Sequence, residues 1–147
     1  MPRYRIRPLE KRDAAPLKEL GRLTIRADGL ATPITPPPKH FEQHSFVAEH
    51  QDGQAIAFAA VLFNPSQKWE LRFAVHPDHR QHGLATRLAR KAITVARRNG
   101  VERIVAKTTT SLPNSAATLE KLGFSKTKFY EHLEYSLELK SDKKKKR

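Results

Sequence analysis

The sequence predicts a single domain of the α+β (α/β) class, in which helices flank one β-sheet. Three observations lead to this prediction. The chain has 147 residues, which is enough for one domain with one ordinary core. Its hydrophobic patterns follow one another in the order β-α-β-β-β-α-β-α-β, without internal repeats. Two of the strands are joined by the dipeptide Asp52-Gly53, which is typical of an antiparallel hairpin turn.

The N-terminal part predicts a strand, a helix and a long loop. The stretch "YRIRPL" alternates over residues 4–9, as expected of a strand. In the helix that follows, Asp13 is expected to be the N-cap and Pro16 lies in the first turn. The apolar stripe of this helix consists of Leu17, Leu20 and Ile25. Four prolines then favour an extended loop over residues 31–39, and a loop of this length is more often functional or mobile than filler.

The middle of the chain predicts three consecutive strands. Residues 45–63 contain two of them, joined by the hairpin turn. The third has the sequence "KWELRFAV", residues 68–75, and Pro77 ends it. Because side chains alternate along a strand, Trp69, Leu71, Phe73 and Val75 are expected on one face and Glu70, Arg72 and Ala74 on the other.

The C-terminal part predicts two helices and two strands. Residues 84–99 form a helix with one apolar row, and Gly100 is a suitable end. The members of that row are Leu84, Leu88, Ala92 and Ala96. A strand at 102–108 leads to a short helix that is capped by Asn114 and ended by Gly123. Residues 130–139 predict the last strand. We expect the domain to span residues 1–139 and the basic tail, residues 140–147, to be disordered.

Composition excludes several classes of protein. The absence of cysteine excludes disulfides, thiolate catalysis and cysteine-ligated zinc. No apolar run approaches the ~20 residues of a membrane span, and the N-terminus is too charged for a signal peptide. We therefore expect a cytoplasmic protein with no membrane partner.

The chain carries a large positive charge. With 28 Lys and Arg against 15 Asp and Glu, the formal net charge is +13. Without the tail, 22 basic and 14 acidic residues remain, so the excess also belongs to the folded part. Such a field attracts nucleic acid, ribosomes, acidic proteins or a phosphate-bearing cofactor, and it does not choose among them. The tail is also suited to nonspecific, salt-sensitive binding of nucleic acid.

The loop "HPDHRQHG", residues 76–83, predicts a phosphate site. It joins a strand to a helix through Gly83, where unpaired helix amides and the helix dipole favour an anion. His76, His79 and His82 are spaced three apart, but a metal triad needs a more rigid scaffold than a proline-containing loop. We therefore expect polar loop residues beside phosphates and no metal. His40 and His44 are interpreted in the same way, with a small allowance for a role on the substrate side.

Two sequence blocks resemble the GNAT superfamily of acyl-CoA-dependent N-acyltransferases. The first block, "LRFAVHPDHRQHGLATRL" at 71–88, contains Arg80-x-x-Gly83-x-Ala85 after a strand that ends in Val-x-Pro. The second block, "NSAATLEKLGF", is similar to the family's Asn followed by a short helix that ends in Leu-Gly-Phe. Both stand in the expected order, and the resemblance covers roughly residues 4–139.

The resemblance implies a fold and a cofactor site. The fold would be a mixed, mostly antiparallel sheet of about six to seven strands flanked by helices, with splayed central strands. Acetyl-CoA would be the cosubstrate, with no metal. Its pantetheine arm would pair with the backbone of Phe73, Ala74 and Val75, and an amide near Val75 would polarise the thioester carbonyl. The expected contacts of the diphosphate and of the rest of the cofactor are Arg80, Gln81, His82, Gly83, Leu84, Ala85, Thr86 and Asn114.

Glu70 is the candidate general base, since a Glu at this offset has that role in similar bacterial protein-lysine acetyltransferases. An alternative is an exposed strand glutamate paired with Arg72 or a lysine. The tyrosine that donates a proton to the leaving thiolate in many family members is replaced here by Leu119. Tyr130 and Ser115 are weak substitutes for it.

These residues predict an N-acetyltransferase that transfers acetyl from acetyl-CoA to a primary amine by direct attack. The acceptor is an amine of a protein or a small molecule. The positive charge disfavours polycationic acceptors and favours a protein amine in acidic surroundings, an aminoacyl-RNA or a ribosomal target. The alternative is a degenerate acyltransferase fold that binds nucleic acid or the ribosome without catalysis. The sequence predicts no oligomeric state.

Overall fold

The computed structural model describes residues 3–28, 44–63, 67–80, 82–109, 113–129 and 132–139. The predicted loop at 31–39 and the predicted tail at 140–147 lie outside these residues. The same is true of Gln81, His40 and Tyr130.

One sheet of seven strands forms the centre of the domain. Its strand order is β1-β2-β3-β4-β5-β7-β6, and every neighbouring pair is antiparallel except β4 and β5. The strands are β1 (Arg5–Pro8), β2 (Ser45–Glu49), β3 (Ala55–Phe63), β4 (Trp69–Val75), β5 (Arg103–Thr109), β6 (Ser125–Phe129) and β7 (His132–Glu138). This arrangement confirms the predicted fold class.

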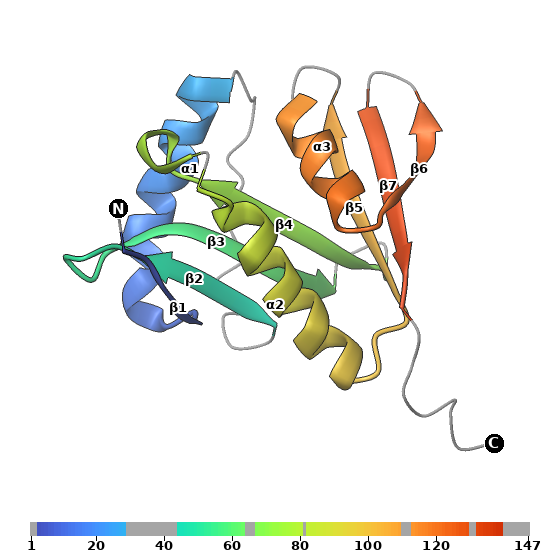
Figure 1. Cartoon of the computed structure of the whole chain (residues 1–147), viewed down its shortest axis with the longest axis horizontal. Coiled ribbons are helices and arrows are strands. Elements are labelled where there is room, and N and C mark those ends of the chain that lie inside the picture. The colour runs from blue at the N-terminus through green and yellow to red at the C-terminus, as the bar shows by residue number, and fades with distance from the viewer. Residues whose placement is uncertain are drawn as a thin grey trace.

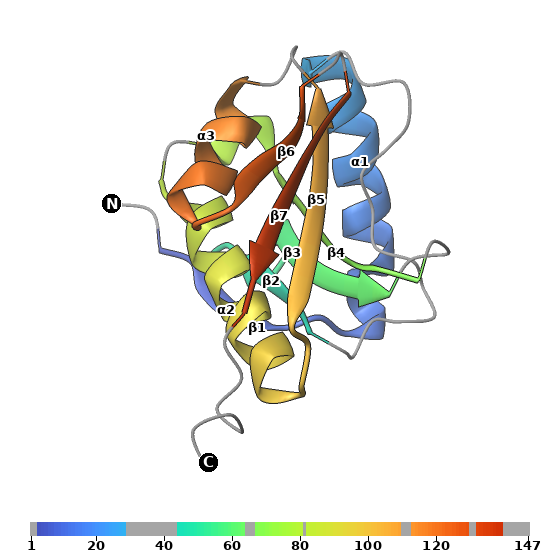
Figure 2. The ribbon, with the colours of Figure 1, turned by 90° about the vertical axis from the view of Figure 1, so that its right-hand side faces the viewer.

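Helices cover both faces of the sheet (Figures 1 and 2). They are α1 (Ala14–Asp28), α2 (Leu84–Arg98) and α3 (Pro113–Lys121). One buried cluster joins α1 to the sheet through Leu17, Leu20 and Phe58. The other joins α2 and α3 to the opposite face and includes the predicted row of Leu84, Leu88, Ala92 and Ala96. In the described part of the chain, no helix combines the length and the apolar character that crossing a membrane requires.

The side chains of β4 alternate between these two clusters as predicted. Leu71 belongs to the cluster under α2, whereas Ala74 belongs to the cluster under α1. Glu70 and Arg72 therefore lie on the α1 face of the sheet. The β3–β4 register runs without a break from Phe63↔Trp69 to Ala57↔Val75, so this alternation holds along the whole strand.

Strands β4 and β5 separate soon after they meet. Their ladder has a single register pair among the described residues, Glu70↔Val105. Beyond this pair the two parallel strands diverge toward their C-terminal ends, and α2 begins beside the end of β4 (Figure 1). The sheet is therefore splayed at its centre, as the resemblance implied.

The expected N-cap role of Asp13 is wrong. Its carboxylate accepts two hydrogen bonds of 2.8 Å from the Arg7 guanidinium and one of 2.8 Å from the Glu10 N–H. Arg7 also donates to Glu49 at 2.7 Å, so the network ties β1, β2 and the short 3-10 helix Lys11–Asp13 together. Burial alone would raise the pKa of Asp13, but the hydrogen bonds from Arg7 and the Glu10 N–H hold that pKa below its usual value.

Two further expectations about the C-terminal part need correction. The sequence predicted one strand after the last helix, whereas the structure has the hairpin β6–β7. Strand β6 is a sheet edge whose Ser125, Lys126 and Thr127 are exposed, so it carries little hydrophobic pattern. The last helix begins at Pro113, which places Asn114 in its first turn instead of at the cap. A proline at the first helical position fits this start.

Candidate active site

A compact loop connects β4 to α2. It contains the 3-10 helix Pro77–His79, and the ring of His76 caps that helix by accepting a hydrogen bond from the Asp78 N–H at 3.0 Å. Pro77 fits the first position because its ring presets the backbone for a helical turn. The loop therefore carries the chain from the end of β4 directly to the start of α2.

Gly83 is the N-cap of α2 and has a left-handed backbone, with φ of 73°. A Cβ built at this position would meet nothing within 4 Å, so the backbone conformation requires glycine and the space beside it is open. No described side chain caps the helix, and its first turn has no acidic residue. The Arg87 N–H is the first to bond back, to the Gly83 carbonyl at 3.1 Å. The amides of residues 84–86 can therefore receive an external anion.

Arg80 lies between the strand and the helix. Its Nε donates a hydrogen bond to the Val75 carbonyl at 3.0 Å. This bond holds the guanidinium at the end of β4, close to the start of α2. The positive charge that the sequence predicted beside the phosphate site is therefore fixed in place by the backbone of the strand it follows.

The backbone of β4 presents polar groups toward β5. The His76 N–H donates to the Ile56 carbonyl on β3 at 2.8 Å. Because backbone groups alternate sides along a strand, the N–H groups of Phe73 and Val75 point away from β3. They point toward the side on which β5 has already diverged. Ala74 is oriented the other way and faces β3, so of the three expected pantetheine contacts the outer two have the suitable direction.

Glu70 lies where the two central strands begin to separate, on the α1 face. Its side chain is nearly buried, so the exposure that the alternative interpretation expected is not found, whereas the Arg72 pairing of that interpretation is: the Glu70 Oε2 is 3.6 Å from the Nε of Arg72. At about 3.3 Å per residue, Glu70 is ~10 Å along the strand from Phe73 and ~17 Å from Val75. A group near Phe73 is therefore closer to Glu70 than a group near Val75, and a distance of this size calls for a water relay in the proton transfer.

The second sequence block contributes to the hydrophobic core, and no catalytic group is identified among its described side chains. Leu119, at the position where many family members have tyrosine, is fully buried in the cluster under α2 and α3. A fully buried leucine supplies no proton donor at this position. Ser115 lies half-buried near the start of α3. The side chain of Asn114 and the whole of Tyr130 are outside the described residues.

In the structure the loop histidines lie against Tyr4 and His50, two residues that the sequence pattern did not connect with them. The resulting group consists of Tyr4, His50, His76, His79 and His82, and is called the histidine cluster below. Ring centroids of His79 lie 4.8 Å from His50 and 5.5 Å from His76. Burial, and after it the neighbouring His50 and His76, lower the pKa of His79. Among the described residues, no three His, Asp or Glu are arranged to hold a metal ion.

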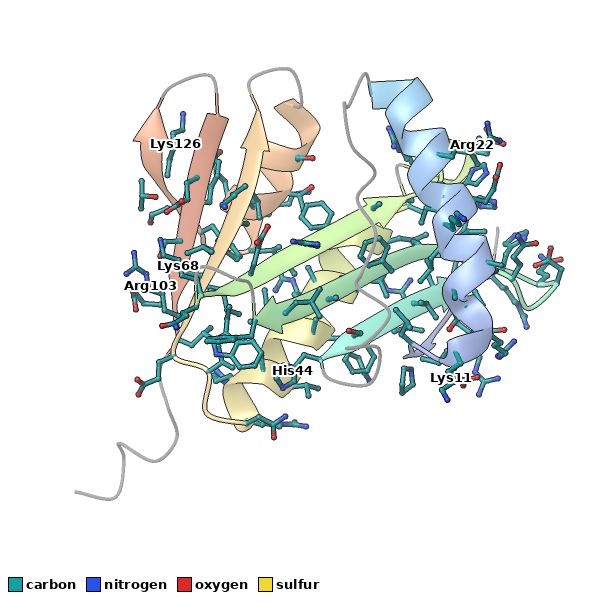
Figure 3. The ribbon with its side chains drawn as sticks, turned by 180° about the vertical axis from the view of Figure 1, so that it is seen from behind. Lys11, Arg22, His44, Lys68, Arg103 and Lys126 are labelled. Carbon is teal, nitrogen blue, oxygen red and sulfur yellow. The ribbon has the colours of Figure 1, made fainter. Side chains whose placement is uncertain are left out.

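His44 is far from this loop, and the allowance for a substrate-side role is not supported. It lies near the C-terminal end of α2 (Figure 3). Its Nε2 is 2.9 Å from Nδ2 of Asn99, and its ring centroid is 5.4 Å from that of Trp69. Burial lowers the pKa of His44, so the ring stays neutral and acts as a packing residue.

Comparisons with known proteins agree with this geometry. The acetyltransferase (GNAT) family matches residues 18–124. yncA, a putative acetyltransferase from Salmonella typhimurium solved with its cofactor acetyl-CoA, superposes with a TM-score of 0.77 at 20% identity over 95% of each chain. Diaminobutyrate acetyltransferase EctA from Paenibacillus lautus, solved with L-2,4-diaminobutyric acid and coenzyme A, has a TM-score of 0.72 at 18% identity over 94% of this chain and 96% of that one.

The GNAT domain of S. lividans PAT has a TM-score of 0.71 at 19% identity, over 92% of this chain and 90% of that domain. At such identities the structural similarity establishes the fold, while the family match covers most of the chain. The protein therefore belongs to the GNAT acetyltransferase family, whose cosubstrate is acetyl-CoA.

Proposed function

We propose that the protein transfers the acetyl group of acetyl-CoA to the nitrogen of a primary amine. One observation carries this proposal: the splayed β4 and β5, the uncapped start of α2 and the Arg80 guanidinium all lie at the same end of β4. Acetyl-CoA, when bound, supplies an acetyl group that its thioester activates toward nitrogen nucleophiles. The chain's own residues bind the donor, orient it and accept the proton of the amine.

The donor is held by backbone groups at two places. The amides of Leu84, Ala85 and Thr86 receive the diphosphate, with Arg80 beside them; the open space at Gly83 supports this placement. Along the strand, the outward N–H groups of Phe73 and Val75 pair with the pantetheine arm. Gln81, His82 and Asn114 complete the proposed contact set, and Ala74 contributes through its position between the two pairing residues.

Glu70 removes the proton from the acceptor amine. A lysine-type amine has a pKa of ~10.4 and is mostly protonated at neutral pH, so it needs a base before it can attack. Glu70 shares the α1 face of β4 with Ala74, on the side of the sheet away from α2. The acceptor therefore approaches from the α1 side, and the Phe73 amide, being nearer to Glu70 than Val75, is the better placed group to polarise the thioester carbonyl.

The attack is direct. The chain has no cysteine to form a thioester with the enzyme. Because Leu119 is buried and apolar, water protonates the departing thiolate of coenzyme A. Thiols are good leaving groups at neutral pH compared with alcohols, so the absence of a tyrosine at this position does not prevent turnover.

The acceptor class follows from charge. Labelled basic residues in Figure 3 lie on several sides of the molecule, from Lys11 and Arg22 at one side to Lys68, Arg103 and Lys126 at the other. A net charge of +13 spread in this way repels polycations and attracts acidic surroundings. The proposed acceptors are a protein amine among acidic residues, an aminoacyl-RNA or a ribosomal amine.

Thermal unfolding with and without acetyl-CoA tests the donor site. A ligand at 100 times its Kd stabilises the folded state by about 2.7 kcal/mol, and a rise in Tm of this size supports the proposal. Acetylation of lysine peptides, peptide N-termini, small amines and aminoacyl-tRNA, followed by release of free coenzyme A, then identifies the acceptor class. No stabilisation together with salt-sensitive RNA binding would favour the alternative, a binding module without catalysis, which the buried Leu119 motivates.

A further inference from the structure

The histidine cluster brings four imidazoles together beside the proposed donor site. His76, His79 and His82 come from the β4–α2 loop, His50 from the turn between β2 and β3, and Tyr4 from the segment before β1. Tyr4 is central to the contacts, with ring centroids 5.4 Å from His50, 5.6 Å from His79 and 5.6 Å from His82. So many titratable rings in contact are unusual, because each protonated imidazole repels the next.

The hydrogen bonds favour His79 over His76 as the group that takes a proton. The Nδ1 of His76 accepts from the Asp78 N–H, so a proton at that nitrogen would break the cap of the 3-10 helix. The Nδ1 of His79 instead lies 2.9 Å from the Tyr4 hydroxyl. A hydroxyl both donates and accepts, so this bond survives protonation of His79 by a rotation of the Tyr4 O–H.

The surroundings of His79 disfavour that proton in the free protein. In the described part of the chain, the groups that act on it electrostatically are His50, His76, His82 and Asp78. The three histidines lower the pKa of His79, as does burial, and only Asp78 raises it. Asp78 is largely solvent-exposed and 3.9 Å from His76 Nδ1, so its compensation is weak. An anion that binds beside the cluster would reverse this balance.

The position of the cluster indicates which anion. His82 directly precedes Gly83, the N-cap of α2, so the cluster adjoins the amides that the proposed function assigns to the diphosphate. We propose that the histidine cluster is a proton-linked phosphate subsite: a phosphate of coenzyme A draws a proton onto the cluster, centred on His79, so that the donor binds more tightly as the pH falls. This inference rests on the proposed function in its choice of ligand.

The sign and size of the effect follow from linkage. Phosphate raises the pKa of the cluster in the complex above its value in the free protein. The gain in affinity therefore begins as the pH falls through the pKa of the complex and is complete below the pKa of the free cluster. Each proton taken up changes the binding constant by at most about tenfold per pH unit within that window. For one proton, we expect the Kd for coenzyme A to fall about tenfold between pH 8 and pH 6.

Isothermal titration of coenzyme A into the full-length protein, in two buffers of different ionisation enthalpy, counts the protons directly. The 3′-phosphate of coenzyme A itself titrates near pH ~6, as phosphate monoesters do, so 3′-dephospho-coenzyme A is titrated in parallel. Uptake with both ligands assigns the subsite to the diphosphate. Uptake with coenzyme A alone is explained by the titration of the ligand's own 3′-phosphate and would overturn the proposal.

His79→Gln is expected to abolish most of the pH dependence of the Kd while the protein still binds coenzyme A. His132→Gln is the matched control, because it removes a histidine from β7, on the other side of the splayed strands, and should keep the dependence. The pKa of His79, measured by NMR on the wild type, should rise when coenzyme A is added.

Binding of coenzyme A with no proton uptake and a flat Kd from pH 8 to pH 5.5 would overturn this inference and leave the proposed function standing. Absence of binding at every pH would overturn both. If His79→Gln fails to fold, the proton count of the wild type still decides.

Discussion

Replacing Gly83 by Ala tests whether the start of α2 holds the diphosphate, and Gly100→Ala is its matched control. Both glycines flank α2, both have left-handed backbones, with φ of 73° and 92°, and a Cβ at either position would meet nothing within 4 Å. The two substitutions therefore impose the same kind of strain at opposite ends of one helix. Only the added methyl group at position 83 would enter the proposed anion site.

The expected stability cost is the same for both variants. A left-handed backbone costs an L-residue about 1–2 kcal/mol. The lower entropy of the unfolded chain offsets about 0.4–1 kcal/mol of this. The net loss of about 1 kcal/mol corresponds to a fall in Tm of about 3 °C for a chain of this size. Differential scanning calorimetry measures it, and a similar shift in both variants shows that the strain is matched.

The expected effects on donor binding differ. A hydrogen bond from an amide to a charged group contributes about 1.5–3 kcal/mol. If the methyl group at position 83 displaces the diphosphate from one amide, the Kd for coenzyme A rises by about 10- to 100-fold. Gly100→Ala should bind coenzyme A like the wild type. Equal affinity of the two variants, measured by calorimetric titration, would refute the placement of the diphosphate at the start of α2.

Three further substitutions test other parts of the structure. Glu70→Gln should lower kcat about 10²- to 10⁴-fold with little change in the Kd for acetyl-CoA, because it removes the base and leaves the donor site intact; unchanged turnover would rule out Glu70 as the base. Asp13→Asn should cost about 3 kcal/mol at pH 7 in urea unfolding, since it removes one of the two carboxylates that pair with the buried Arg7 guanidinium. The lowered pKa of Asp13 means that the wild type loses this advantage as the pH falls through that pKa, so the gap between the two proteins should narrow as the pH falls below the usual range of an aspartate, and a constant gap would contradict the assignment. Leu88→Ala, at a fully buried position of α2, should cost about 2–5 kcal/mol with the urea m-value unchanged; a cost below 1 kcal/mol would mean that α2 is not packed as described.

Features that depend on neighbouring residues could be predicted from the sequence. The Asp52-Gly53 turn is one, because the chain closes there through the Gly53 N–H and the His50 carbonyl, 2.8 Å apart. The buried row of α2 and the alternation of β4 are others, since a helix or strand period places each side chain relative to its neighbours. Gly83 also belongs here, because its left-handed backbone is a local requirement.

The helix boundaries show where local signals compete. Asp13 and Asn114 both have the chemistry of an N-cap, and neither acts as one. Asp13 is engaged by Arg7, and Pro113 starts the last helix one residue earlier. A capping preference of about 1 kcal/mol is easily outweighed by a buried ion pair or by proline.

The sequence by itself determined the order of the helices and strands as far as the last helix, the strand faces and the glycine at the start of α2, because these depend on contacts within a few residues. Only the tertiary structure decided which distant residues meet. Tyr4 reaches His79 across 75 positions, and Arg7 reaches Glu49 across 42. The burial of Glu70 and the separation of β4 from β5 were also decided at this level, since both depend on how the strands assemble. No local period encodes such contacts, because they arise when separate elements pack to bury their apolar faces.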